Sequence, residues 1–292
     1  MRNATAHSVT DGVIASAAAA PDPRLREIFA ALIHHLHAFV REAEVTPGEW
    51  AAAIAFLTQT GQKCDAMRQE FILLSDTLGV TMLVDAQANR KSGAATESTV
   101  LGPFHTDDTP DVAFGASIAS EGKGEPLVVR GRVTDTAGTP LVGAVLEAWE
   151  TDGEGRYDTQ YSERERPDCR GRVRTAADGR YAFRAVLPVP YSIPTDGPVG
   201  ALMTRLGRHA MRPAHLHLAI SAPGHVAVTT AIYVEGDPYL DSDAVFGVKS
   251  SLIEPFLRHD SAAEGQALGI RAPFYTLDRD FILERARAVQ PV

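Results

Sequence analysis

Residues 212–234 read RPAHLHLAISAPGHVAVTTAIYV, and this stretch decides the fold of the C-terminal half of the chain. Two runs with the composition of β-strands, His215–Ser221 and Val226–Val234, flank Pro223-Gly224. Such a dipeptide is typical of a tight turn. The stretch therefore predicts two strands around a turn.

Two earlier segments have the same design. Strand-like residues 127–134 and 144–150 surround a Gly-Thr-Pro turn. Residues 172–175 and 181–186 surround Asp178-Gly179, a dipeptide that favours hairpins. Short strands at this spacing, separated by Gly and Pro turns, predict an antiparallel β-sandwich.

The N-terminal half has the period of helices instead. Apolar residues recur at three- and four-residue spacings from Arg24 to Glu44, the pattern of an amphipathic helix. Thr46-Pro47-Gly48-Glu49 has the residues of a helix start, and further helices are expected over residues 64–78 and 80–88. We therefore expect an α+β chain with a flexible arm at residues 1–22, a helical domain at 23–98 and a β-sandwich at 99–292.

Composition excludes several classes of protein. The chain has 28 Lys and Arg against 37 Asp and Glu, a net charge of −9, whereas a nucleic-acid-binding surface must be basic. No apolar run approaches the roughly 20 residues of a membrane span, and the polar N-terminus does not resemble a signal peptide. Cys64 and Cys169 lie in segments of different character and predict no disulfide framework. We expect a cytoplasmic globular protein.

His215 and His217 are the strongest candidates for metal ligands. Residues i and i+2 of a strand point to one face, so the two imidazoles can lie side by side while Leu216 packs on the other face. Two ordinary histidines on a polar face are the alternative interpretation. The pair alone suits zinc, iron, copper or nickel, and His225 in the following turn could complete a zinc site with three histidines.

Two loop tyrosines extend the candidate site. Tyr157 follows Gly155 after a strand-like run, and Tyr191 lies between prolines that stiffen the backbone. A tyrosine in such a loop is commonly an ordinary half-buried ring. As a ligand, a phenol whose free pKa is about 10 requires a strong Lewis acid, and ferric iron is the natural one.

A set of short motifs runs through the chain. They are Leu101-Gly102-Pro103-Phe104, Val129–Val133, Ala148-Trp149-Glu150, Gly155-Arg156-Tyr157, Arg170–Arg172, Asp178–Tyr181, Tyr191–Pro194, Asp196-Gly197-Pro198, Gly207–His209 and Arg212–His217. Together they resemble the intradiol ring-cleavage dioxygenases over roughly residues 25–280. Members of that family bind non-haem Fe(III) through two tyrosines and two histidines. The resemblance implies Tyr157, Tyr191, His215 and His217 as ligands.

The helical half implies the branch of this family that acts on catechol and hydroxyquinol. Its members form homodimers through these helices, and the apolar interface often holds a phospholipid. Phe71-Ile72-Leu73-Leu74 is compatible with such an interface, although core packing is the simpler explanation.

Further residues follow from resemblance to the hydroxyquinol subfamily, which includes the segment Asp241–Val248. Asp85 is expected to accept a hydrogen bond from a third ring hydroxyl, because an unpaired buried carboxylate is costly. A solvated helix Asp is the alternative. The implied substrate pocket comprises Met82, Asp85, Val100, Leu101, Gly102, Pro103, Phe104, Ile193, Pro194 and Val245.

The resemblance also implies roles in the reaction of an aromatic 1,2-diol with O₂. Tyr191 and a hydroxide accept the two protons of the diol, and Arg212 stabilises negative charge on the ring carbon that attacks O₂. A structural ion pair is the alternative role for Arg212. Ala231 stands where most relatives carry glutamine, a departure that bears on the rate and on the choice of substrate.

Two alternatives stay open. The substrate could be catechol or a substituted catechol in place of hydroxyquinol. Val129–Val133 and Gly179–Phe183 also resemble prealbumin-like binding modules without catalytic activity, in which the histidine pair would be incidental.

Overall fold

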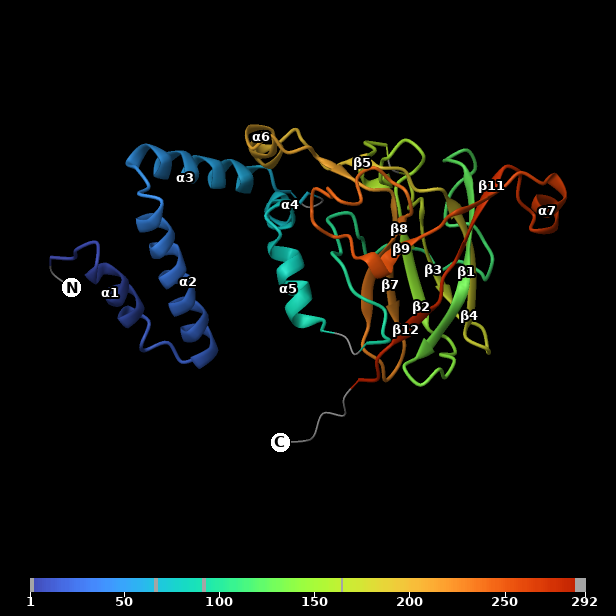
Figure 1. Cartoon of the computed structure of the whole chain (residues 1–292), viewed down its shortest axis with the longest axis horizontal. Helices are drawn as coiled ribbons and strands as arrows, with labels where there is room; N and C mark the ends of the chain where they lie inside the picture. Colours follow the sequence, from blue (N-terminus) through green and yellow to red (C-terminus); the bar gives the residue numbers. More distant parts are fainter. Residues whose placement is uncertain (1–2, 66–67, 91–92, 164, 287–292) are drawn as a thin grey trace. The chain divides into compact units, whose positions relative to one another are not determined.

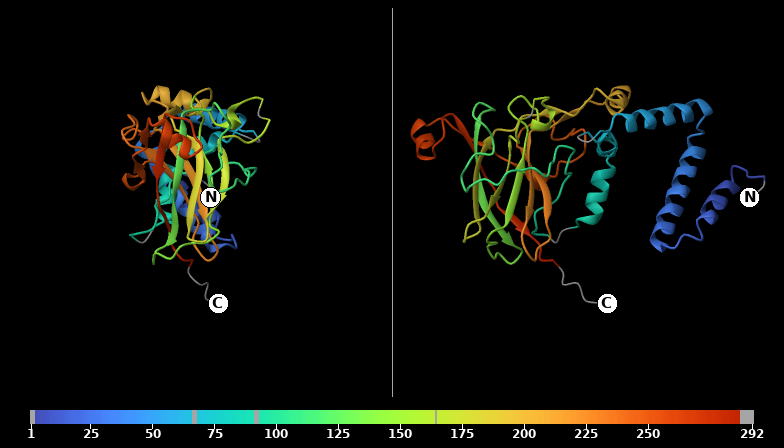
Figure 2. Two further views of the ribbon diagram at one scale, coloured as in Figure 1. Left: turned by 90° about the vertical axis from the view of Figure 1, so that its right-hand side faces the viewer. Right: turned by 180° about the vertical axis from the view of Figure 1, so that it is seen from behind.

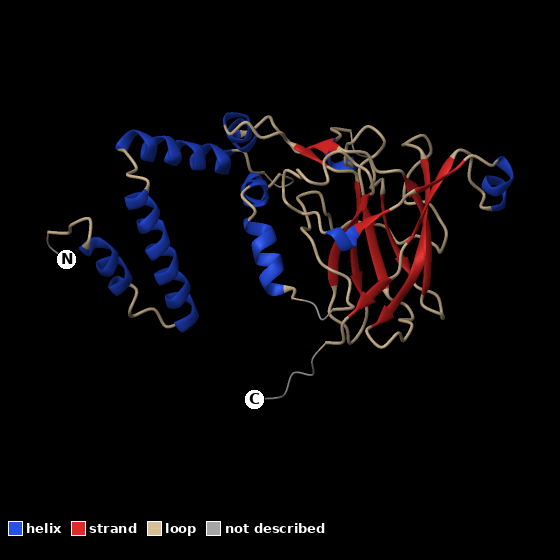
Figure 3. Cartoon of the chain, viewed as in Figure 1, coloured by secondary structure: helices blue, strands red, loops and turns tan. Residues whose placement is uncertain are grey.

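The computed structural model of the 292-residue chain describes residues 3–65, 68–90, 93–163 and 165–286. The chain divides into two compact units, Met1–Gln59 and Thr60–Val292. Helices make up the first unit, and the strands gather in the second (Figure 3). The division falls inside the expected helical domain, because the helices after residue 69 belong to the second unit. The expected boundary at residue 98 stays a prediction.

The first unit contains α1 (Ser8–Ser16), α2 (Pro23–Glu42) and most of α3 (Pro47–Gln62) (Figure 1). Asp22 caps α2 by accepting a hydrogen bond from the Arg24 amide at 2.8 Å. The helix start expected at Thr46 is confirmed: the Glu49 carboxylate accepts from the Thr46 amide at 2.8 Å, and the Thr46 hydroxyl accepts from the Glu49 amide at 3.3 Å. Helix α1 lies within the expected arm, where the sequence analysis had not anticipated a helix.

The second unit is built on a β-sandwich. The first sheet has the order β10 (Leu257–His259), β11 (Phe274–Asp278), β1 (Pro126–Asp135) and β12 (Phe281–Leu283), and β4 (Arg180–Val186) pairs with β1. The second sheet has the order β3 (Arg170–Arg174), β2 (Val145–Trp149), β7 (His215–Ser221), β8 (Val228–Val234) and β9 (Ile253–Glu254). The main core lies between the sheets and includes Leu127, Phe183, Leu146 and Leu216, each fully buried.

Smaller elements surround the sandwich. They are α4 (Glu70–Thr77), α5 (Val80–Ala88), η1 (Asp158–Gln160), β5 (Tyr191–Ser192), α6 (Pro198–Arg205), β6 (Met211–Arg212), η2 (Ser250–Leu252) and α7 (Ala262–Ala267). Helix α4 packs against α5 and α6. Helix α7 lies on the side of the sandwich away from α4 and α5, as two opposite views show (Figure 1 and Figure 2).

The predicted α+β architecture is confirmed, but two of the three expected strand pairs are wrong. Strands β7 and β8 form the predicted hairpin, with His217 opposite Ala231. Strand β1 pairs with β4, and β2 pairs with β3, so each of the two earlier turns carries the chain from one sheet to the other. The sandwich is also not purely antiparallel. Strands β11 and β12 run parallel to β1, and β9 runs parallel to β8, because long connections allow the chain to return in the same direction.

Within the described residues, no single helix is long and apolar enough to cross a membrane. Taken together, α4 and α5 have the length and apolar composition of a membrane span, but the two helices are bent by 77° relative to each other.

Candidate metal centre and active site

A small two-stranded sheet places one tyrosine beside Arg212. Strand β5 pairs with β6 so that Tyr191 lies opposite Arg212. Three residues after Arg212 the chain enters β7, whose first residue is His215. The short sheet therefore holds Tyr191 next to the start of the histidine strand.

The second tyrosine comes from the loop after β2. Gly155 has φ +77°, and a Cβ at this position would lie 3.1 Å from Tyr191 Cβ, so glycine lets this loop approach β5 closely. The loop then starts η1, where the Tyr157 amide donates to the Gln160 side chain at 2.8 Å. These contacts direct Tyr157 towards Tyr191.

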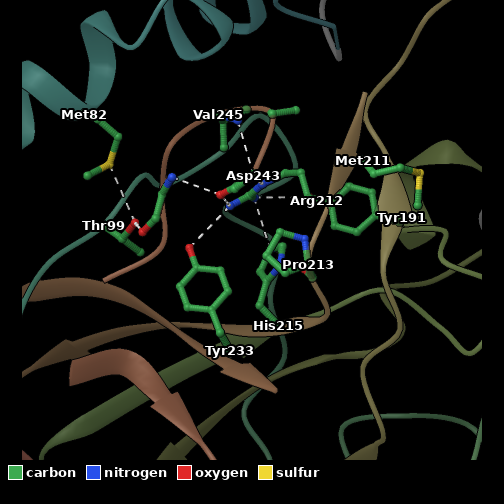
Figure 4. Close-up of polar contacts among 12 residues, drawn as sticks. Met82, Thr99, Tyr191, Met211, Arg212, Pro213, His215, Tyr233, Asp243 and Val245 are labelled. Atoms are coloured by element: carbon green, nitrogen blue, oxygen red, sulfur yellow. Dashed lines mark hydrogen bonds and ion pairs between the residues drawn. The ribbon is translucent and has the colours of Figure 1, made fainter. Parts of the chain in front are cut away.

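The four candidate ligands converge at one buried place. The Tyr157 hydroxyl donates to the Tyr191 hydroxyl at 3.4 Å, and their rings meet edge to face. The Nε2 atoms of His215 and His217 are 3.1 Å apart. Arg212 Nη1 joins the two pairs, because it donates to Tyr191 Oη at 3.3 Å and to His215 Nε2 at 3.1 Å (Figure 4). All four side chains are at most 5% exposed.

Both imidazoles are suited to metal binding. The His215 Nδ1–H donates to the Pro213 carbonyl at 2.7 Å, so Nε2 carries the lone pair that faces the cluster. Burial, followed by the charge of Arg212, lowers the pKa of His215 well below its ordinary value. Burial and the neighbouring His215 lower the pKa of His217 in the same way. The neutral imidazole is the form that binds metals, and for His215 the hydrogen bond of Nδ1 also directs the Nε2 lone pair towards the cluster.

The phenols fit a strongly charged cation. Burial, with the nearby Tyr191 as the second cause, raises the pKa of Tyr157 well above its ordinary value. A phenolate at this place therefore requires a compensating positive charge, and ferric iron supplies three such charges. Two phenol oxygens and two imidazole nitrogens are a chemically suitable donor set for it.

His225 does not join the cluster. It lies in the turn beyond the far end of β7, and a seven-residue strand spans roughly 20 Å. Its ring contacts the carbonyl of Pro223 at 3.0 Å. In the part of the chain that the structure describes, no group of three His, Cys, Asp or Glu could hold a metal. The hypothesis of a zinc site with three histidines is therefore wrong.

Aromatic rings support the candidate ligands. The Phe104 ring stacks on Tyr157 with centroids 4.4 Å apart. Trp149, opposite His217 in the sheet register, stacks on that imidazole at 4.9 Å with the planes 4° apart. Neither ring contributes a ligand atom, yet each limits how its neighbour can rotate.

A cavity of about 440 Å³ is lined in part by Phe104, the ring that stacks on Tyr157, whereas none of the four candidate ligands lines it. Its walls include Pro103, Phe104 and Pro194, three of the residues expected in the substrate pocket. Gly102 is also near the cluster, because a Cβ on it would lie 3.7 Å from His217 Nε2. Of the other expected pocket residues, Leu101 is 43% exposed, whereas the buried ones are Val100, Ile193 and Val245.

Met82 and Asp85 both lie on α5, and the contacts of Asp85 are with Asn89, Ser98 and Lys249, not with the four candidate ligands. The Thr99 hydroxyl contacts Met82 Sδ at 3.7 Å. Asp85 accepts hydrogen bonds from Asn89 at 2.8 Å and from Ser98 at 2.9 Å, and Lys249 Nζ lies 3.5 Å away. The alternative of a solvated Asp85 is therefore wrong, since these groups enclose its carboxylate.

Asp243 and Tyr233 also contact Arg212 (Figure 4), and no pattern in the sequence distinguishes either residue as part of the site. Although burial opposes the charge, the Asp243 carboxylate holds the pKa of Arg212 well above its ordinary value. A buried arginine requires an acidic partner, but nothing in the sequence indicates which of the 37 acidic residues it is.

Comparisons with known proteins agree along most of the chain. A family model described as "Dioxygenase" matches residues 100–276, and one described as "Catechol dioxygenase N terminus" matches residues 22–96. The hydroxyquinol 1,2-dioxygenase of a Rhizobium species is 50% identical over 94% of this chain and 93% of its own length. The 6-chlorohydroxyquinol 1,2-dioxygenase of Cupriavidus pinatubonensis is 47% identical over 95% of this chain and 96% of its own length.

A solved structure agrees with this assignment. The hydroxyquinol 1,2-dioxygenase of Pseudomonas putida superposes with a TM-score of 0.87 at 47% identity, covering 95% of this chain and 98% of that one. Because the first family model spans more than half of the chain and these relatives cover nearly all of it, the protein is an enzyme that belongs to the intradiol ring-cleavage dioxygenases.

Proposed function

We propose that this enzyme cleaves hydroxyquinol (benzene-1,2,4-triol) between its two adjacent hydroxylated carbons and inserts both atoms of O₂. The product is 3-hydroxy-cis,cis-muconate, the enol form of maleylacetate. All atoms of both reactants enter the product, so the reaction requires no external reductant. The convergence of Tyr157, Tyr191, His215 and His217 on one buried point carries the proposal.

These four side chains would hold one Fe(III). When bound, the ion acts as a Lewis acid that draws electron density from the diol and makes its ring reactive towards O₂. Tyr191 Oη is the group that takes a proton from a substrate hydroxyl, because it lies at the border between the cluster and Arg212. Arg212 Nη1 faces the same point and stabilises the negative charge that develops on the ring carbon.

The choice of hydroxyquinol rests on the names of the relatives and on Asp85. Its carboxylate is held by Ser98 and Asn89, and it accepts a hydrogen bond from the third ring hydroxyl in our proposal. Catechol lacks that hydroxyl and would leave this interaction unmade. Ring-substituted diols, including 6-chlorohydroxyquinol, are the second candidate class, since one relative is named for that compound.

Metal analysis and oxygen uptake test the proposal. We expect about one iron per chain and consumption of one O₂ per hydroxyquinol, with a higher kcat/KM for hydroxyquinol than for catechol. His217→Ala should lose iron, whereas the matched control His225→Ala should retain it. A purified protein that contains no iron after reconstitution, or that consumes no O₂ with any of these diols, would contradict the proposal.

We also propose that the enzyme is a homodimer formed through α2. Leu25, Ile28, Leu32, Leu36 and Phe39 lie along one face of this helix and are 48–57% exposed in the single chain. Such a continuous apolar face is typical of an association surface. A phospholipid in this interface is a further expectation, tested by mass spectrometry of solvent extracts of the purified enzyme.

A further inference from the structure

Every donor of the Arg212 guanidinium has a partner, and the partners lie on two sides. A guanidinium has five N–H donors in one rigid plane. On the first side, Nε donates to Asp243 Oδ1 at 3.0 Å, and Nη2 donates to Asp243 Oδ2 at 3.3 Å and to Tyr233 Oη at 3.4 Å. On the second side, both donors of Nη1 face the candidate ligands Tyr191 and His215.

The Asp243 carboxylate is itself held by the backbone. Its Oδ1 also accepts from the Val245 amide at 3.3 Å, and its Oδ2 accepts from the Gly247 amide at 2.9 Å. The carboxylate is buried, as is the guanidinium that it contacts. The ion pair is therefore shielded from water, and its position follows the backbone of residues 243–247.

This turn is anchored to the elements around the active site. The Ala244 amide donates to the Met211 carbonyl at 3.1 Å, and the Thr99 hydroxyl donates to the Gly247 carbonyl at 2.6 Å. A Cβ on Gly247 would lie 2.8 Å from Tyr233 Oη and 3.1 Å from Arg212 Nη2. The turn thus packs directly on the guanidinium and leaves no space for it to move in that direction.

We propose that Asp243 is a positioning residue for Arg212, with Tyr233 as its auxiliary. Because the guanidinium is planar and rigid, holding Nε and Nη2 on one side determines where Nη1 points on the other. Asp243 thereby directs both N–H groups of Nη1 towards the cluster of candidate ligands, where the proposed substrate would bind, while its own hydrogen bonds go to Arg212 and to the backbone of the turn. This inference rests on the role proposed above for Arg212.

Asp243→Asn is the primary test, because it keeps the shape of the side chain and removes its charge. We expect kcat to fall by about 100-fold, the loss that a displacement of about 1 Å can cause in an active site. Iron content and the affinity for hydroxyquinol measured without O₂ should stay at the wild-type values. A purely structural role would instead lower iron content, affinity and kcat together.

Asp135→Asn is the matched control. Asp135 is buried, accepts from the amides of Ala137 and Thr139 at 2.9 Å each, and is paired with Arg285 at 2.7 Å. It therefore has the same kinds of partner as Asp243, but none of them belongs to the active site. Asp135→Asn should lower the melting temperature and leave kcat unchanged.

A double-mutant cycle separates this inference from the proposed function. If Asp243 acts through Arg212, Asp243→Asn should cost nothing further in an Arg212→Ala background. An equal loss in both backgrounds, or full kcat in the single variant, overturns the positioning role. If Arg212→Ala itself retains full kcat, the role proposed for Arg212 fails first. Should Asp243→Asn fold poorly, Tyr233→Phe removes a single acceptor oxygen and enters the same cycle.

Discussion

Tyr157 and Tyr161 are four residues apart, yet their phenol groups differ in burial and in hydrogen-bond partner. Tyr157 is fully buried and points at Tyr191. The Tyr161 hydroxyl donates to Asp152 at 2.5 Å, and this hydrogen bond raises the pKa of Tyr161 to about 12. Of the two tyrosines, Tyr157 therefore belongs to the cluster of candidate ligands, whereas the hydroxyl of Tyr161 is bound to Asp152.

We therefore expect different results from Tyr157→Phe and Tyr161→Phe. The first change removes a proposed ligand and should weaken iron binding by more than the roughly 10- to 100-fold effect typical of supporting residues. It should also remove or shift the red colour expected of tyrosinate bound to ferric iron. Absorption spectra and iron content of both variants provide the measurement. Equal spectra for the two would rule out Tyr157 as a ligand.

A second prediction at the residue scale concerns Asp135 and pH. Hydrogen bonds from Arg285, followed by that from the Thr139 amide, lower the pKa of Asp135 to about 2. The Asp135 carboxylate therefore binds a proton less readily in the folded protein than in the unfolded chain. The contribution of ionised Asp135 to the free energy of unfolding is complete above the unfolded pKa near 4 and is lost as the pH falls through about 2.

Urea denaturation at several pH values measures this contribution. The free energy of unfolding should be higher for the wild type than for Asp135→Asn at neutral pH, and the two should approach each other between about pH 4 and pH 2. A difference that stays constant over this range would show that the charge of Asp135 contributes nothing.

The sequence indicated the candidate ligands, but it did not indicate the residues that support them. The i, i+2 spacing of His215 and His217 is visible in one strand, whereas the tyrosines required the family resemblance, because a loop tyrosine has no distinguishing pattern. The support from Asp243 joins two places 31 residues apart. Such a contact depends on the packing of three segments and leaves no local pattern in the sequence.

At the scale of elements, the side chains of strand β7 point alternately to the two faces of the second sheet. Leu216 and Leu218 are fully buried in the core between the sheets, and His215 and His217, which alternate with them, point to the candidate metal centre. This alternation separates stability from metal binding within a single strand.

Leu216→Ala should lower the free energy of unfolding by about 2–5 kcal/mol, the usual cost of truncating a buried leucine. Iron content should be retained, since the removed atoms lie on the core face. Leu206→Ala is the matched control, because Leu206 is 58% exposed and should change stability by less than about 0.5 kcal/mol. Urea denaturation and metal analysis test both. Loss of iron from folded Leu216→Ala would contradict the separation of the two faces.

Most strands could be located from the sequence, but of the three expected pairings only that of β7 with β8 is correct. The Asp178-Gly179 turn and the alternating runs beside it are correct, yet β3 and β4 lie in different sheets. A turn within one sheet and a turn between two sheets use the same residues. The difference depends on which faces are buried together, and that is a property of the assembled sandwich.

At the scale of the whole molecule, the comparisons exclude the prealbumin-like module without catalytic activity, because curated enzymes match nearly the full length. The composition could not decide this question. The resemblance of both halves to one family did, since a helical unit and a β-sandwich occur together in it.

The proposed dimer gives a prediction at this scale. Leu32→Glu introduces a charge into the apolar face of α2 and should convert the dimer into a monomer, measured by light scattering after size exclusion. His34→Glu is the control, because residue 34 lies about half a turn around the helix from that face. A wild-type enzyme that is monomeric at micromolar concentration would contradict the proposal, as would a Leu32→Glu dimer of unchanged stability.

The alternation along β7 has a practical consequence for anyone producing the enzyme. A shift of β7 by one residue against β8 would turn both imidazoles into the sandwich interior and bring leucines to the metal centre. A chain misfolded in this way retains every ligand residue and still cannot acquire iron. In our proposal, the red absorbance of tyrosinate bound to ferric iron, divided by the protein concentration, therefore reports the fraction of molecules in a preparation whose strands have paired correctly.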